Sequence, residues 1–226
     1  MSGQPDRGAV VIITGPPGAG KTTVAAALAA GSAQRAVHLH SDDFYDFIRS
    51  GYVPPYRAAA HEQNRVVTGV LAGAAFGYAA GGYLVMLDGI IGPWFLDPFR
   101  ARRDAPLHYV VLRPELPETL RRAQGRAGRE LRESGPIRSL HQQFSQLGGL
   151  EPHALDTTAL TAGQTVAQVR AALAAGRLRL PPGPLPAPGP LPAPGPPPAP
   201  EPLPAPGPPP APGPALAPRG PAPAFS

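Results

Sequence analysis

The sequence of 226 residues predicts one α/β domain, a three-layer α/β/α sandwich around a parallel sheet, followed by a proline-rich tail. Three observations support this prediction. Short β-branched runs alternate with longer stretches of helical character, as in parallel sheets whose strands are joined by crossover helices. The first of these runs leads through a glycine-rich loop into a helix. The last 46 residues hold 23 of the 35 prolines and cannot contribute to a core.

Five strands and the helices between them can be placed along the chain. Residues 9–14 form a continuous β-branched run that ends in glycine and proline, which is typical of a strand buried on both faces of a parallel sheet. Thr161 is followed three residues later by Gln164, the capping-box pattern at a helix start. The expected strands span residues 9–14, 36–40, 83–87, 108–112 and 153–156, and the expected helices span about 22–30, 58–80, 115–126, 133–147 and 161–175.

The chain divides into three parts by composition. We expect a flexible N-terminus over residues 1–8, a folded domain over 9–180 and a disordered tail over 181–226. The tail repeats a proline-rich hexapeptide six times over residues 183–218, with glycine no more often than every sixth residue, which excludes a collagen helix. Its prolines lack the N–H groups that helices and sheets need, so an extended, polyproline II-rich segment is predicted. Either a spacer without a partner or a ligand for a proline-binding module fits this composition.

Composition and charge narrow the function classes. The chain has no cysteine, which excludes disulfides and thiolate metal sites, and it has no apolar stretch long enough for a signal sequence or a membrane span. We therefore expect a cytoplasmic protein that does not enter a membrane. The net charge is +5, and residues 100–138 hold ten arginines against five acidic residues. This region fits phosphate clamps, a nucleic-acid surface or simply a solvated helical face.

The motif G-x-x-x-x-G-K-[ST] is matched at every fixed position between the first strand and the first helix. Its glycines let the backbone wrap closely around an anion, so that N–H groups and the helix N-terminus point at phosphates. Lys21 is expected to reach the β- and γ-phosphates of ATP, and the Thr22 hydroxyl to ligate Mg²⁺. The predicted nucleotide-binding residues are Gly15, Pro16, Pro17, Gly18, Ala19, Gly20, Lys21, Thr22 and Thr23.

Lys21 is the only lysine among the 20 basic residues of the chain. A compact ammonium on a flexible stem fits inside a closed backbone loop where a planar guanidinium would not. The only lysine of the chain therefore stands at the position where a phosphate-binding loop requires one. Because no second lysine exists, the chain cannot build the N-K-x-D or T-K-x-D motif with which the usual GTPases read guanine.

Carboxylates follow the second and third expected strands. Asp42 or Asp43, after residues 36–40, can accept a proton from an acceptor hydroxyl, with Asp42 favoured; both also fit the cap of a following helix. Asp88 ends the run 83–87 in the manner of an aspartate that holds Mg²⁺. Gly89 follows it, where ATP-hydrolysing motors commonly place a glutamate that activates water. Phosphoryl transfer to a bound acceptor therefore fits better than hydrolysis.

Several other side chains are candidates for the same site. An arginine after the fourth strand can neutralise charge on the transferred phosphoryl group, with Arg122 and Arg126 favoured among Arg121, Arg122, Arg126 and Arg129. Aromatic residues can line an acceptor pocket or pack in the core, namely Tyr45, Tyr52, Tyr56, Trp94 and Phe95. His38 and His40 alternate on an expected buried strand without metal-ligand spacing, so we interpret them as core or site-wall residues.

The segments GPPGAGKTT, HSDDFY and VMLDG, together with the arginines after LRPEL, resemble the P-loop small-molecule kinases. This group includes shikimate, gluconate and uridine kinases, chloramphenicol phosphotransferases and zeta toxins, and belongs more broadly to AAA-type ATP-binding proteins. The resemblance covers about residues 9–175. It implies a five-stranded parallel sheet of order 2-3-1-4-5 in a P-loop NTPase fold, an arginine-bearing lid after the fourth strand, and Asp42 as the acceptor base.

The sequence therefore predicts an ATP- and Mg²⁺-dependent kinase that phosphorylates a hydroxyl of a small molecule, whose identity no motif reveals. Two other functions remain open. The domain can act as a nucleotide-dependent switch whose proline-rich tail recruits a partner. It can also phosphorylate nucleic-acid ends, but a charge of +5 without interleaved aromatic and basic residues makes nucleic-acid binding the less favoured alternative.

Overall fold

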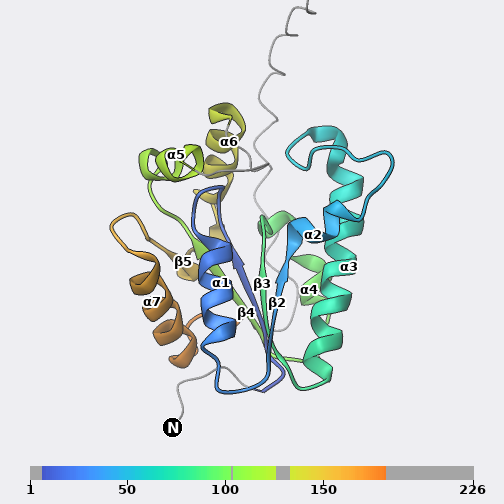
Figure 1. Cartoon of the computed structure of the whole chain (residues 1–226), viewed down its shortest axis with the longest axis vertical. Helices are drawn as coiled ribbons and strands as arrows, with labels where there is room; N and C mark the ends of the chain where they lie inside the picture. The colour runs from blue at the N-terminus through green and yellow to red at the C-terminus, as the bar shows by residue number, and fades with distance from the viewer. Residues whose placement is uncertain (1–6, 103, 126–132, 182–226) are drawn as a thin grey trace, which may run out of the picture. The chain divides into compact units, whose positions relative to one another are not determined.

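A computed structural model of the chain describes residues 7–102, 104–125 and 133–181 (Figure 1). The expectations for residues 1–6, for the tail beyond residue 181 and for Arg126 and Arg129 lie outside the described residues. None of the helices in the described ranges combines the length and apolar character needed to cross a membrane.

The sheet has five strands in the order β2-β3-β1-β4-β5, and all neighbouring strands are parallel. This confirms both the fold class and the strand order expected from the resemblance. In register, Asp88 lies beside Ile13 on one neighbouring strand and beside His40 on the other. The carboxyl ends of the strands therefore meet at one edge. The strands are β1 (Val10–Thr14), β2 (Ala36–His40), β3 (Leu84–Asp88), β4 (Leu107–Leu112) and β5 (Ala154–Leu155).

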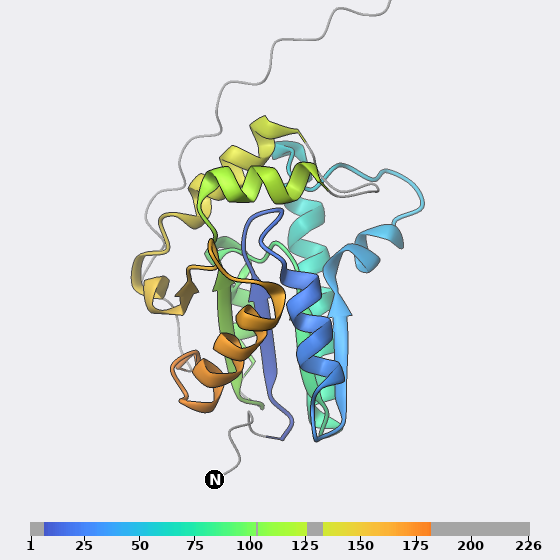
Figure 2. The ribbon, with the colours of Figure 1, turned by 60° about the vertical axis from the view of Figure 1, so that its left-hand side comes forward.

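Helices cover both faces of the sheet (Figures 1 and 2). On β1, Val11 and Ile13 pack toward α1 (Lys21–Ala30) and α7 (Ala162–Ala174), whereas Val10 and Ile12 pack toward α3 (His61–Ala80) and α4 (Asp97–Arg100). This alternation is the period of two expected of a strand buried on both faces. Beyond the carboxyl ends of the strands lie α5 (Leu116–Gln124) and α6 (Ser134–Phe144).

The predicted helices are present, and the capping box of Thr161 and Gln164 opens α7 as expected. The structure adds short elements that the sequence did not reveal. They are the helix α4 and the 3₁₀ turns at Pro93–Phe95 and Gly148–His153. The helix after Asp42 and Asp43, an open alternative in the sequence, is present as α2 (Ser41–Asp46), and a 3₁₀ turn at Ala58–Ala60 opens the expected helix 58–80. One expectation was wrong: β2 is an edge strand whose residues are only half-buried, so His38 and His40 do not lie on a buried strand.

The last described segment of the domain turns back against the start of β4. The amide of Tyr109 donates to the carbonyl of Leu178, and the amide of Leu180 donates to the carbonyl of Leu107, each over 2.9 Å. Both Leu178 and Leu180 are buried. The hydrophobic core therefore extends to Leu180, beyond the end of α7.

Candidate active site at the carboxyl edge of the sheet

The loop between β1 and α1 is held in a conformation that only glycine tolerates. Gly15 and Gly18 have φ angles of 141° and 82°. A Cβ on Gly15 would lie 2.1 Å from the carbonyl oxygen of Leu112, and a Cβ on Gly18 would lie 2.5 Å from that of Thr119. The loop is therefore wedged between the end of β4 and the helix α5, and its glycines allow this close approach.

The N-terminus of α1 is open to an anion. Gly20 caps the helix without a side-chain hydrogen bond, and the first turn holds no acidic residue. The ammonium of Lys21 reaches back over the loop and donates to the carbonyl of Pro16 over 3.0 Å. An uncapped helix N-terminus carries partial positive charge and N–H donors, so the loop, the helix end and Lys21 together form a cationic cradle.

Asp88 is the centre of a hydrogen-bonded cluster at the end of β3. Its side chain has no exposed surface. The Thr22 hydroxyl donates to its Oδ2 over 2.7 Å, and His38 Nε2 lies 2.6 Å from its Oδ1. His40 Nδ1 lies 3.1 Å from Oδ2. Because an ionised carboxylate can only accept hydrogen bonds, both imidazoles present N–H groups to it.

The electrostatics of this cluster keep Asp88 charged. Burial alone would raise the pKa of Asp88, but hydrogen bonds from His40, Thr22 and His38 together hold it below its usual value. In return, the hydrogen bond to Asp88 raises the pKa of His40, against the opposing effect of burial. The cluster therefore presents a fixed negative charge directly beside the first turn of α1.

His40 also connects Asp88 to the acidic start of α2. Its Nε2 lies 3.6 Å from Asp42 Oδ2, while its Nδ1 faces Asp88. Asp42 accepts a hydrogen bond from the Ser41 hydroxyl over 3.1 Å, and its side chain is 71% exposed. Asp43 is exposed as well and lies in the same first turn. Asp42 thus stands one imidazole away from Asp88 and is open to a ligand.

The chain leaving β3 is fixed by close contacts. A Cβ on Gly89 would lie 2.3 Å from the Ser41 hydroxyl oxygen, so no larger residue fits between β3 and α2. Beyond it, the amide of Ile91 donates to the Thr14 hydroxyl over 2.9 Å, and the Tyr109 hydroxyl donates to the carbonyl of Ile91 over 2.8 Å. Glycine therefore follows Asp88 because a side chain at position 89 would collide with Ser41.

Arg122 lies at this edge of the sheet but its guanidinium contacts protein groups. It pairs with Glu118 on α5, and its Nη2 lies within 3.3 Å of the carbonyl oxygens of Thr157, Thr158 and Leu160. These carbonyls belong to the segment that follows β5. Arg121 pairs with the same glutamate. Within the described residues, Arg122 thus joins α5 to the β5–α7 loop.

The aromatic candidates divide into two groups. Tyr45, Trp94 and Phe95 are partly buried and pack against the core beside α3, and the Trp94 ring lies 5.4 Å from that of Phe144. By contrast, Tyr52 and Tyr56 are 49% and 41% exposed. The first group therefore contributes to packing, and the two exposed tyrosines are the more accessible to a ligand.

Sequence reasoning missed the pairing of both histidines with Asp88. The usable signal was their spacing: side chains two residues apart on a strand share a face, and the strand that ends in Asp88 was expected beside them. Thr22 and Asp88, both predicted as metal ligands, do lie together.

Comparisons with known proteins agree with this fold. A gluconokinase from Sinorhizobium meliloti 1021 superimposes with a TM-score of 0.57 at 18% identity, over 76% of this chain and 95% of that one. A tunicamycin resistance protein from Deinococcus radiodurans gives 0.54 at 18% identity, over 77% and 99%. Shikimate kinase from Acinetobacter baumannii gives 0.50 at 19% identity, over 76% and 94%. The chain therefore has the fold of the P-loop small-molecule kinases, as its motifs indicated.

At the level of sequence, no curated protein matches the chain. A protein-family model described as an AAA domain matches residues 11–138. The matched segment begins in β1, includes the phosphate-binding loop, Asp42 and Asp88, and ends in α6. Because this segment is more than half of the chain, the protein belongs to the AAA domain family.

Proposed function

We propose that the protein is an ATP-dependent kinase that transfers the γ-phosphate of ATP to a hydroxyl group of a small molecule. The observation that carries this proposal is the position of Asp42. It is an exposed carboxylate that lies one imidazole from Asp88, at the edge where the cationic cradle of the loop ends. Phosphoryl transfer needs these three features together: a phosphate cradle, a metal-binding carboxylate and a proton acceptor.

The phosphates of ATP would lie in the loop of residues 15–20 and against the first turn of α1. The uncapped N–H groups of that turn and the ammonium of Lys21 supply donors and positive charge. Lys21 would exchange its bond to the carbonyl of Pro16 for the β- and γ-phosphate oxygens. Charge built up on these oxygens during transfer is stabilised by donors that are already in place, which lowers the barrier.

Mg²⁺ fits the oxygen atoms of Thr22 and Asp88. Their 2.7 Å hydrogen bond puts a hydroxyl and a carboxylate whose pKa is lowered side by side, next to the phosphate cradle. Mg²⁺ usually takes one or two protein oxygens, with phosphate and water as its other ligands, and Thr22 and Asp88 would supply the two protein oxygens. When bound, Mg²⁺ neutralises charge on the β- and γ-phosphates.

Asp42 would act as the general base. As the acceptor hydroxyl oxygen attacks the γ-phosphorus, Asp42 takes the hydroxyl proton, and the bond from that phosphorus to the oxygen of the leaving ADP breaks. His40 lies between Asp42 and Asp88 and holds both carboxylates in position. Asp43 is the alternative base, because it occupies the same turn.

The chain favours transfer over ATP hydrolysis. A water-activating glutamate cannot occupy position 89, because the Ser41 side chain fills the space beside the Gly89 backbone. The fold neighbours include enzymes named gluconokinase and shikimate kinase, whose names denote small hydroxylated acceptors. We therefore place the acceptor of this protein in the same chemical class, which includes polyols, sugar acids and related metabolites.

An arginine from the region after β4 would complete the phosphate clamp. Arg122 must first leave Glu118 and the carbonyls after β5 to reach a phosphate. Arg126 lies outside the described residues, four positions after Arg122 in the sequence. Both remain proposed catalytic residues, and Arg122→Gln should perturb stability as well as turnover if its contacts to Thr157 and Thr158 matter.

The test begins with a screen of small hydroxylated metabolites, nucleosides and antibiotics for an ATP-dependent mass gain of one phosphate. With an acceptor found, Lys21→Ala should abolish transfer without changing the unfolding temperature of the ligand-free protein. Asp42→Asn should keep Mg²⁺–ATP binding and lose about 10²- to 10⁴-fold in kcat. Asp43→Asn is the matched control. Near wild-type turnover by Asp42→Asn together with loss in Asp43→Asn would reassign the base, and unchanged turnover by Lys21→Ala would refute the kinase proposal.

A further inference from the structure

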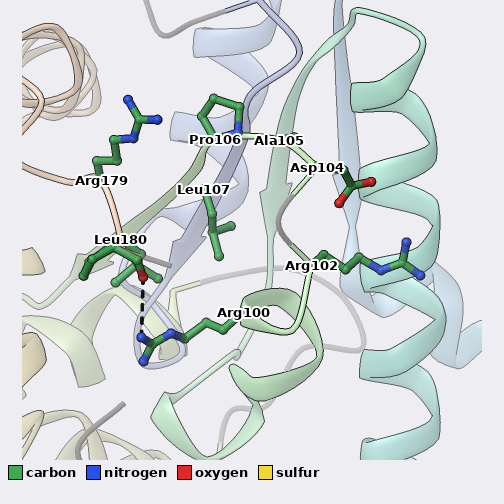
Figure 3. A pocket seen from close by; sticks show the side chains of 9 residues that line it. Arg100, Arg102, Asp104, Ala105, Pro106, Leu107, Arg179 and Leu180 are labelled. Atoms are coloured by element: carbon green, nitrogen blue, oxygen red, sulfur yellow. Dashed lines mark hydrogen bonds between the residues drawn. The ribbon is translucent and has the colours of Figure 1, made fainter. Parts of the chain in front are cut away.

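A cavity of about 230 Å³ lies away from the phosphate-binding loop, near the amino end of β4 (Figure 3). The segment between α4 and β4 and residues 179–181 line it. Because β1 and β4 are parallel, the loop after β1 lies at the opposite end of the sheet. The cavity is therefore separate from the proposed kinase site.

Arg100 is the unusual residue of this cavity. It is only 8% exposed, yet its Nε and Nη1 have no hydrogen-bond partner within the described part of the chain. Its Nη2 makes one long contact of 3.5 Å to the carbonyl oxygen of Pro181. No carboxylate forms an ion pair with it among the residues that the structure describes. A buried cation without a close counterion costs several kcal/mol, and a bound anion would offset part of that cost.

The neighbouring side chains favour an anion. The cavity is lined by three arginines, Arg100, Arg102 and Arg179, against one acidic residue, Asp104. Figure 3 shows Arg102 and Asp104 extending toward α3, whereas Arg100 extends toward Leu180. The guanidinium of Arg102 lies over the ring of Phe76, 5.7 Å from its centroid. Arg100 is therefore the guanidinium available to a ligand in the cavity, and the positive field of the others adds to it.

We propose that this cavity binds a small anion through the carboxylate or phosphate oxygens that accept hydrogen bonds from Arg100. Its volume is below the range of about 300–1,000 Å³ in which drug-sized ligands bind, so the ligand is a small metabolite or a single anionic group. Leu107 and Leu180 also line the cavity and give it an apolar part, where an ion pair is stronger than in water. Burial lowers the pKa of Arg100, and the charge of Asp97 offsets only part of this effect.

The test uses the full chain and inorganic phosphate as the probe. Thermal unfolding is measured with increasing phosphate at constant ionic strength in a Lys21→Ala background, which removes the lysine of the phosphate-binding loop. We expect phosphate to raise the unfolding temperature, because a ligand that binds only the folded state stabilises it. Adding Arg100→Met should abolish this rise. Without phosphate, Arg100→Met should unfold no lower than its parent, because it replaces an unpaired buried charge with an apolar side chain of similar length.

The outcomes can also overturn the proposal. If Arg100→Met fails to fold, Arg100→Lys replaces it, and phosphate affinity measured by calorimetry should fall by about tenfold or more, because an ammonium lacks the planar fork. An equal phosphate response with and without Arg100 would overturn the proposal, as would no response in any of these variants.

Discussion

Replacing Asp88 with asparagine should destabilise the domain even without nucleotide. The Asp88 carboxylate is fully buried and accepts hydrogen bonds from Thr22, His38 and His40. Asparagine has the same size as aspartate but only one acceptor oxygen, and its NH₂ group would face the hydrogen-bond donors of these neighbours. A hydrogen bond to a charged group contributes about 1.5–3 kcal/mol. The substitution removes one such bond and weakens the other two. We therefore expect the free energy of unfolding to fall by about 3–5 kcal/mol, as when one partner of a buried charge pair is removed.

Urea unfolding of the ligand-free protein measures this loss. For a domain of this size the loss corresponds to an unfolding temperature lower by roughly 6–20 °C. The matched control is Asp42→Asn, whose side chain is 71% exposed and whose free energy of unfolding should change by less than about 0.5 kcal/mol. His38→Asn, which removes one donor, should have an intermediate effect and be non-additive with Asp88→Asn. Equal stability of Asp88→Asn and the wild type would refute the argument that these bonds hold the carboxylate.

Three further predictions follow from other contacts. Gly18→Ala places a Cβ 2.5 Å from a carbonyl oxygen at a φ of 82°, so it should lower the free energy of unfolding by about 1–3 kcal/mol. The control is Gly69→Ala on α3, whose Cβ would meet nothing within 4 Å and which should raise that free energy by about 0.5–1 kcal/mol. Urea unfolding measures both. Similar effects of the two substitutions would contradict the tight packing of the loop. A chain ending at residue 181 should unfold at the temperature of the full chain, but one ending at residue 176 loses the buried Leu178 and Leu180, worth about 2–5 kcal/mol each. A large fall for the longer chain would show that the tail stabilises the domain. Burial lowers the pKa of His153 below 6.5 in the folded protein. As the pH falls, the unfolded chain therefore takes up the proton first, and the free energy of unfolding decreases below about pH 6.5. The decrease is at most about 1.4 kcal/mol per pH unit. Unfolding measured between about pH 7.5 and 5.5 should show a less positive slope of stability against pH for His153→Gln than for the wild type, and an unchanged slope would contradict a contribution from His153.

The features that sequence reasoning predicted are those set by local pattern. A β-branched run, a glycine-rich loop and an alanine-rich helix occur consecutively, so β1, the loop and α1 follow from residues close in sequence. The same holds for the capping box of α7, whose partners are three residues apart. Asp88 could be placed at a strand end because a short apolar run precedes it.

The features that sequence reasoning missed depend on contacts between residues that are far apart in the sequence. His38 and His40 meet Asp88 across a separation of about 50 residues in sequence, so no local pattern showed the pairing. The helix α4 has four residues, too few to produce a periodic signal. The contacts of Arg122 with the loop after β5 are also set by tertiary packing. The half-burial of β2 follows from its position at the sheet edge, which its composition does not encode.

The return of residues 177–180 against β4 affects how the protein folds during its synthesis. Leu178 and Leu180 complete a core whose other strands were made earlier, so the domain cannot close until these residues have left the ribosome. The sequence continues for 46 residues beyond Leu180. At about 5–20 residues per second, adding these residues takes roughly 2–9 s, which is long compared with the folding of many single domains. The domain up to Leu180 can therefore fold while this segment is still being synthesised.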